Sequence, residues 1–153
     1  TLAIALIPGS MVLVSLFSAS ITFILARGVL KRLGHPFSPL PSFREWQMPW
    51  WLIYGFILGL ALVLAEDYLG GGIWPNVGKN IVFVYLPILL INGLAVAVYF
   101  YRRWKLTPIL KGVMFFILLF NLPFVLPFFV LIGAFDPLFD YRRLKRKEKK
   151  END

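Results

Sequence analysis

Cysteine is absent from the 153 residues, and histidine occurs only once. The lack of cysteine excludes disulfide frameworks, thiol catalysis and metal sites that need cysteine ligands. The single histidine, His35, lies in a proline-rich segment with no acidic residue or second histidine beside it, whereas a metal site needs several ligands. Serine–histidine nucleophile patterns, HExxH and glycine-rich nucleotide fingerprints are missing as well. We therefore expect a protein that is not an enzyme and that binds no cofactor.

Charge is also scarce. Charged residues make up 16% of the chain and hydrophobic residues 59%, whereas ordinary globular domains carry about 25% charge. The hydrophobic residues are concentrated in long blocks, which is typical of a membrane protein. A net charge of +8 is a common sign of nucleic-acid binding, but seven of the 16 basic residues lie in one tail beside an apolar block. The expected partner is therefore the lipid bilayer and not nucleic acid.

The uncharged block over residues 112–135 has 24 residues. About 20 apolar residues cross the hydrocarbon core of a bilayer, and a soluble core helix has no reason to be apolar on every side. All five tryptophans lie at the ends of such blocks or between them, as in an aromatic belt. The sequence therefore predicts an all-α, polytopic transmembrane helical bundle of about four spans with short interfacial helices. The expected spans are residues 8–30, 49–65, 81–106 and 108–135, followed by an interfacial helix and basic tail over 136–153.

Two short helices are expected at the membrane surface. Residues 42–45 have the serine-to-glutamate spacing of a capping box. Asp136 is followed by proline and is suited to cap a helix over about 138–147. Asp140 would then lie one turn further on, beside Arg143 at i+3. Capping and ion pairing thus explain both aspartates without catalysis.

Two asparagines and two glycines are the candidate cavity or helix-packing residues. The third and fourth spans should form an antiparallel hairpin about Thr107, with Asn92 fifteen residues before it and Asn121 fourteen after it. These separations place both amides at nearly one depth, facing the protein interior and in reach of each other. A cross-helix hydrogen bond of this kind contributes about 1 kcal/mol, and a substrate contact also fits. Gly55 and Gly59 have a GxxxG spacing, which either permits close helix approach or is a chance pair.

The basic tail supplies the candidate lipid-headgroup residues. They are Arg142, Arg143, Lys145, Arg146 and Lys147, chosen because Lys and Arg clusters beside a span attract anionic headgroups. Counting basic residues does not decide the orientation, since each side of a four-span bundle would carry eight. The density of charge in the tail favours a cytoplasmic tail.

Three segments carry a family resemblance. They are Phe43-Arg44-Glu45-Trp46-Gln47-Met48-Pro49, Asn92-Gly93-Leu94-Ala95-Val96 with Tyr99-Phe100-Tyr101-Arg102-Arg103, and Gly133-Ala134-Phe135-Asp136-Pro137-Leu138-Phe139-Asp140-Tyr141-Arg142-Arg143. In these segments the chain resembles the YybS-like family of bacterial predicted membrane proteins, a family of unknown function. The resemblance covers most of the chain after about Ser42.

That resemblance implies a C-terminal half of a longer, multi-pass protein of the bacterial inner membrane, whose N-terminal helices are missing here and would be its partners. The family is distantly similar to the substrate-binding S components of energy-coupling-factor vitamin transporters. This implies a helical bundle that binds a small solute and a membrane partner subunit, without supplying ligand residues. One hypothesis is therefore a transport subunit with a polar cavity at Asn92 and Asn121, shaped by the Gly55 and Gly59 face. The alternative is a non-catalytic membrane scaffold or assembly partner with a filled interior.

Overall fold

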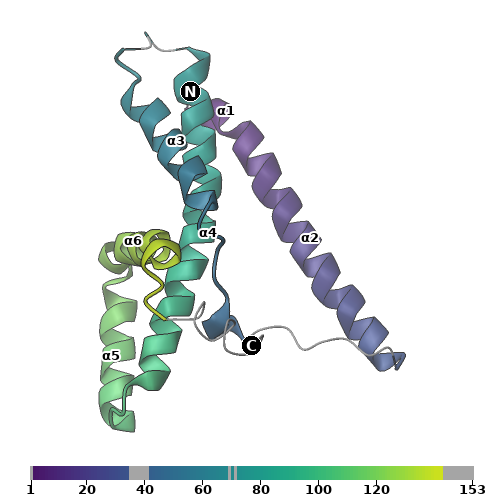
Figure 1. The fold of residues 1–153 in the computed structure, drawn as a ribbon, viewed down its shortest axis with the longest axis vertical. Helices are drawn as coiled ribbons and strands as arrows, with labels where there is room; N and C mark the ends of the chain where they lie inside the picture. Colours follow the sequence, from purple (N-terminus) through teal and green to yellow (C-terminus); the bar gives the residue numbers. More distant parts are fainter. Residues whose placement is uncertain (1, 35–41, 69, 71, 143–153) are drawn as a thin grey trace, which may run out of the picture. The chain divides into compact units, whose positions relative to one another are not determined.

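The computed structural model describes residues 2–34, 42–68, 70 and 72–142. Over these residues the chain forms helices and turns and no strand, so the predicted all-α class is confirmed (Figure 1). The elements are α1 (Leu2–Ala5), α2 (Ile7–Arg32), the 3-10 helix η1 (Phe43–Glu45), α3 (Leu52–Leu64), α4 (Ile73–Arg103), α5 (Pro108–Phe120) and α6 (Leu122–Phe139). Three helices, α2, α4 and α6, are long and apolar enough to cross a membrane.

The chain folds into two compact units. Unit 1 comprises Thr1–Leu40 and Gly55–Tyr85, and unit 2 comprises Pro41–Tyr54 and Leu86–Asp153. The division passes through α3 and α4, so the N-terminal part of α4 belongs to unit 1 and its C-terminal part to unit 2. Each unit has its own helix crossing and its own polar contacts.

In unit 1, α3 packs along the N-terminal part of α4 (Figure 1). The glycines of α3 face this contact: a Cβ atom on Gly55 would collide with the Tyr85 hydroxyl, and one on Gly59 would lie 2.6 Å from Cγ2 of Ile81. Gly78 of α4 lies at the same contact, where a Cβ atom would be 2.9 Å from the Gly59 carbonyl oxygen. Small residues on both helices let the two backbones approach closely.

Asn80 attaches the start of α2 to α4 within unit 1. Its Oδ1 accepts a hydrogen bond from the Gly9 N–H at 2.6 Å, and its Nδ2 donates to the Ala5 carbonyl at 2.6 Å. Gly9 is the buried residue of α2, and only 6% of the apolar window of this helix is covered by the rest of the chain. The helix is therefore attached near its N-terminal end and leaves its remaining surface to lipid or to another protein.

In unit 2, α5 returns beside the C-terminal part of α4, with the Lys111 ammonium 5.3 Å from the centre of the Tyr101 ring. Thr107 is the N-cap of α5 and Pro108 is its first residue, where proline is favoured because the first N–H groups of a helix have no intrahelical acceptor. The hairpin between these two helices therefore has the turn that the sequence predicts.

A second crossing in unit 2 joins α4 to α6, and Figure 1 shows α6 nearly end-on beside α4. Here the backbones touch: a Cβ atom on Gly93 would collide with the Phe129 carbonyl oxygen, and one on Gly133 with the Leu89 carbonyl oxygen. Backbone atoms cannot turn aside as a side chain can. Only glycine fits at these two positions, which places the close approach on residues 93 and 133.

The prediction of one continuous helix over 108–135 is wrong. The chain forms α5 and α6 instead, and Asn121 between them has non-helical angles, φ −104° and ψ 21°. Pro123 explains the break, because it has no N–H to donate to the Leu119 carbonyl four residues earlier and its ring would clash with that carbonyl in a continuous helix. Asn121 N–H still bonds the Ile117 carbonyl at 3.1 Å, which ends α5 in an orderly turn.

Two other predicted helices differ in length. The segment expected over 49–65 forms α3 with 13 residues, about 20 Å of helix, which is shorter than the ~30 Å hydrocarbon core. The helix expected over 81–106 begins earlier, at Ile73, and has 31 residues. It absorbs Pro75, which is tolerated because it falls in the first turn.

Candidate functional site

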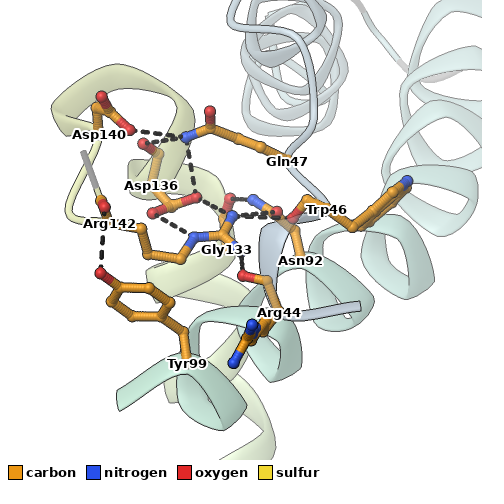
Figure 2. A network of polar contacts seen from close by, with 9 residues as sticks. All are labelled: Arg44, Trp46, Gln47, Asn92, Tyr99, Gly133, Asp136, Asp140 and Arg142. Carbon is orange, nitrogen blue, oxygen red and sulfur yellow. Dashed lines mark hydrogen bonds and ion pairs between the residues drawn. The ribbon is translucent and has the colours of Figure 1, made fainter. Parts of the chain in front are cut away.

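The most polar part of the described interior is a cluster around Arg142 in unit 2 (Figure 2). The guanidinium Nη2 lies 2.5 Å from Oδ2 of Asp136, and both side chains are 0% exposed. Nη1 donates to the Arg44 carbonyl at 2.8 Å, and Nη2 donates to the Trp46 carbonyl at 2.9 Å. A buried charge is tolerated only when it is paired and hydrogen-bonded. Here the arginine has both kinds of partner.

A left-handed residue at the end of α6 brings Arg142 back toward Asp136. The helix ends at Phe139, and Asp140 takes φ 45° and ψ 52° while its N–H bonds the Asp136 carbonyl at 2.8 Å. Aspartate and asparagine enter this region more readily than other residues with a side chain. The reversal lets a residue six positions after Asp136 reach its carboxylate, although the two would lie on different faces of a continued helix.

Gln47 closes the other side of the cluster. Its Nε2 lies 3.2 Å from Oδ2 and 3.3 Å from the carbonyl oxygen of Asp136, and 3.4 Å from Oδ1 of Asp140. The segment that follows η1 thus contributes two backbone carbonyls to the arginine and one side-chain amide to the aspartates (Figure 2). The segment therefore connects the N-terminal part of unit 2 to the end of α6.

Asn92 has a structural task that follows from the sequence of α6. Pro137 lies inside this helix and has no N–H for the carbonyl four residues earlier, which belongs to Gly133. Asn92 supplies the missing donor: its Nδ2 bonds the Gly133 carbonyl at 2.7 Å, and its Oδ1 lies 3.4 Å from Nη2 of Arg142. The Asn92 amide therefore satisfies a backbone carbonyl of α6 that lacks its helical donor, and it also contacts the arginine of the cluster.

The cluster is satisfied from within. Among the described residues, no buried side-chain nitrogen or oxygen lacks a hydrogen-bond partner, and no group of three or more histidine or acidic side chains could hold a metal ion. A fully satisfied buried network rigidifies a fold and specifies one arrangement of its helices. The geometry thus fixes the positions of η1, the C-terminal part of α4 and α6 within unit 2.

The two asparagines singled out in the sequence do not face each other. Asn92 is 0% exposed, whereas Asn121 is exposed and donates from Nδ2 to the Ile117 carbonyl of its own helix at 2.9 Å. The expected pairing fails because α5 ends at Asn121, so the helix that would have carried this amide past Asn92 stops there.

The other predicted site residues separate into two groups. Gly55 and Gly59 lie at the contact between α3 and α4 in unit 1, where they allow close packing. Arg142 was expected among the lipid headgroups, but the structure buries it against Asp136 because that carboxylate needs a cation. The remaining expected headgroup residues lie outside the described part of the chain: Arg143, Lys145, Arg146 and Lys147.

Asp136 was also expected in a different role. It does not cap a helix over 138–147, because α6 continues past it to Phe139 and buries its carboxylate. The signal that could have found this role is the position of a lone acid within the last turns of an apolar helix, which demands a nearby cation.

The segments that carry the family resemblance are those that meet in the cluster: 43–49 through Gln47, 92–103 through Asn92, and 133–143 through Asp136 and Arg142.

Comparison with known families agrees with this membrane character. The model of a family described as "Predicted membrane protein (DUF2232)" matches residues 1–137. The chain belongs to the DUF2232 family. The DUF2232 match includes Asn92, Gly93, Gly133 and Asp136 and ends before Arg142. Comparisons with curated proteins and with solved structures gave no significant match.

Proposed function

We propose that this DUF2232 protein is a non-catalytic, multi-pass scaffold of the bacterial cytoplasmic membrane that serves as an assembly partner for another membrane subunit. The observation that carries the proposal is the closed polar network of unit 2. Its arginine, carboxylate and amide groups are directed at one another, and none in the described residues is left over for a substrate. A network of this kind maintains a shape, which is the requirement of a scaffold.

The surface of α2 supports an assembly role. This helix has 26 residues, and Gly9 is the one buried against the described part of the chain. Ser15, Ser18 and Thr22 give it a small, weakly polar face, and the hydroxyls of Ser15 and Thr22 bond backbone carbonyls one turn earlier. Small faces of this kind let a second transmembrane helix approach closely.

A solute-binding transport subunit, related through the YybS-like resemblance to the S components of energy-coupling-factor transporters, is the competing proposal. It requires a cavity with free polar groups near Asn92 and Asn121. Asn92 is fully buried and donates to Gly133, and Asn121 bonds its own helix. Both placements favour the scaffold over the transporter.

Cross-linking from single cysteines in α2 tests the scaffold. The 153 residues contain no cysteine, so Ser18→Cys and Ser20→Cys each introduce one thiol of the same kind. Ser20 lies about 200° further around the helix than Ser18 and serves as the matched control. After the thiol is labelled with a maleimide that carries a photoreactive group and native membranes are illuminated, we expect a discrete adduct with one partner from Ser18→Cys and little from Ser20→Cys.

Two results would contradict the scaffold. One is equal labelling of many proteins from both positions, which indicates random collisions in the bilayer. The other is a large rise in the thermal unfolding midpoint of the purified protein with one vitamin or other small solute, together with no adduct from either cysteine. The second result would instead support the transport subunit.

A further inference from the structure

An open hollow of about 220 Å³ lies on unit 2, outside the buried network. Its lining consists of Arg44, Glu45, Tyr99, Arg102 and Arg103. Three guanidinium groups against one carboxylate give this lining a net charge of +2. The volume has room for several water-sized groups, each of which takes about 30 Å³ in the liquid. A hollow of this size and charge is suited to a compact anion.

Two walls of the hollow are positioned by the Arg142 network. The Tyr99 hydroxyl donates to the Arg142 carbonyl at 3.3 Å and accepts from Nη1 of Arg103 at 3.4 Å. On the other wall, the Arg44 carbonyl accepts from Nη1 of Arg142 at 2.8 Å, which fixes the backbone from which the Arg44 side chain extends. The buried network therefore holds the basic side chains of the hollow on a rigid frame.

The arginines themselves are only lightly engaged. Arg44 lies 3.5 Å from the Glu45 carboxylate, and the two side chains are 46% and 40% exposed. An ion pair this exposed contributes little, typically under about 1 kcal/mol, so an arriving anion can displace it. Arg103 makes one long hydrogen bond to Tyr99, and both Arg102 and Arg103 are exposed.

We propose that this hollow binds a phosphate group. Guanidinium groups bind phosphate through paired, charge-assisted hydrogen bonds, and three of them around one concavity form an arrangement that a carboxylate or a halide would use less fully. The C-terminal end of α4 opposes an anion with a partial charge of only about −0.5, which is outweighed by the +2 of the lining. The phosphate belongs either to a phospholipid headgroup or to a phosphorylated small solute.

The position of the hollow fits both sources. Arg102 and Arg103 form the last turn of α4, and Trp104 follows with 48% of its surface exposed. Tryptophan and basic residues at the end of a long apolar helix are typical of the membrane–water interface, where headgroup phosphates lie and dissolved phosphates can also reach.

The test uses the purified full chain and its Arg102→Gln/Arg103→Gln variant, with Arg32→Gln as the matched control because Arg32 is an exposed arginine at the end of α2. One arm titrates inorganic phosphate and glycerol phosphate against the thermal unfolding midpoint, with chloride at equal ionic strength as the reference. The other arm measures the phospholipids that copurify and the exchange of phosphatidylglycerol in phosphatidylcholine nanodiscs. Arg103→Lys, which retains the charge but loses the forked donor, is included in case the double variant folds poorly.

We expect binding at least tenfold weaker for each arginine removed, an intermediate loss for Arg103→Lys and none for Arg32→Gln. Stabilisation by the soluble phosphates assigns the hollow to a phosphorylated solute. Retention of phosphatidylglycerol by the wild type and Arg32→Gln, but not by the double variant, assigns it to a headgroup. The proposal is overturned if phosphate stabilises no better than chloride while all variants retain the same phospholipid.

Discussion

The ion pairs that stabilise the two units of this protein differ in burial. Unit 2 has at its centre a fully buried ion pair between Asp136 and Arg142, surrounded by carbonyls and amides. The corresponding ion pair of unit 1, Lys79 with Glu66 at 2.7 Å, leaves side chains 26% and 45% exposed. An exposed pair can be lost at little cost, whereas a buried one leaves an uncompensated charge when either partner is removed.

The helix crossings of the two units also differ in how closely the two backbones approach. At the α4–α6 crossing in unit 2, the space beside Gly93 is filled by backbone atoms of Phe129. At the α3–α4 crossing in unit 1, the space beside Gly55 is filled by the tip of the Tyr85 side chain, which can rotate away, and the backbone contact at Gly78 is less close. Unit 1 therefore has more room for adjustment than unit 2. Substitutions that affect the polar groups of each unit test this contrast.

The largest effect is expected from Arg142→Met. It leaves the Asp136 carboxylate buried without a cation, and it removes donors from the Arg44 and Trp46 carbonyls. Removing one partner of a buried pair costs about 3–5 kcal/mol, so we expect unit 2 to lose its fold or to unfold at a much lower temperature. Arg32→Met changes an exposed arginine of unit 1 in the same way and should unfold close to the wild type. Thermal unfolding in detergent, followed by tryptophan fluorescence and circular dichroism, measures both.

A double variant separates the cost of an unpaired buried charge from the cost of the lost hydrogen bonds. In Asp136→Leu/Arg142→Met the buried ion pair is replaced by apolar side chains, so part of the lost stability should return. The Arg44 and Trp46 carbonyls still lack a donor, and Gln47 loses its contact with the Asp136 carboxylate, so the recovery should be incomplete. Equal stability of Arg142→Met and the wild type would contradict the view that this pair holds unit 2. Equal loss in Arg142→Met and Arg32→Met would remove the contrast between the units.

An intermediate effect is expected from Asn92→Leu, also in unit 2. The substitution leaves the Gly133 carbonyl buried without a donor, at a cost of about 1–3 kcal/mol. Pro137→Ala restores an N–H four residues after that carbonyl, so Asn92→Leu/Pro137→Ala should be more stable than Asn92→Leu. The comparison of the four proteins by thermal unfolding gives the coupling between the two positions.

Strict additivity in that cycle would show that the Asn92 amide does not replace the missing proline donor. A positive coupling free energy would show that Asn92 and Pro137 act together, with the Asn92 amide on α4 supplying the donor that Pro137 removes from α6. Asn92 lies 3.4 Å from Arg142 as well, so the rescue should be partial.

The apolar blocks predict the helical class and most helix positions, because a run of about 20 apolar residues has few alternatives to a helix in a membrane. The start of α5 is also predictable from the sequence, since Thr107 at the N-cap and Pro108 at the first helical position are residues favoured there. The break at Asn121 is harder to see. Proline is often tolerated within transmembrane helices, so Pro123 alone does not distinguish a kink from an end.

The cluster around Arg142 could be predicted only in part. Its members come from three distant segments, and Asp140 in the left-handed region, which turns Arg142 toward Asp136, is not the glycine that usually marks such a reversal. A buried carboxylate needs a cation, but five basic residues follow Asp136 within the next eleven positions and the sequence does not rank them. Long-range contacts decide the choice, and periodicity within one helix carries no information about them.

The smallest effects are expected from two other asparagines, one in each unit. Asn80→Leu removes the bonds to Gly9 and Ala5, and a cross-helix bond in a membrane contributes about 1 kcal/mol. The Asn121 side chain is exposed and donates to the Ile117 carbonyl of its own helix, so Asn121→Leu should lie within about 0.5 kcal/mol of the wild type. Faster hydrogen exchange at the start of α2 in Asn80→Leu, with unit 2 unaffected, would show that unit 1 can loosen locally without unfolding unit 2. Loss of protection throughout the protein would contradict it, because the units would then unfold as one.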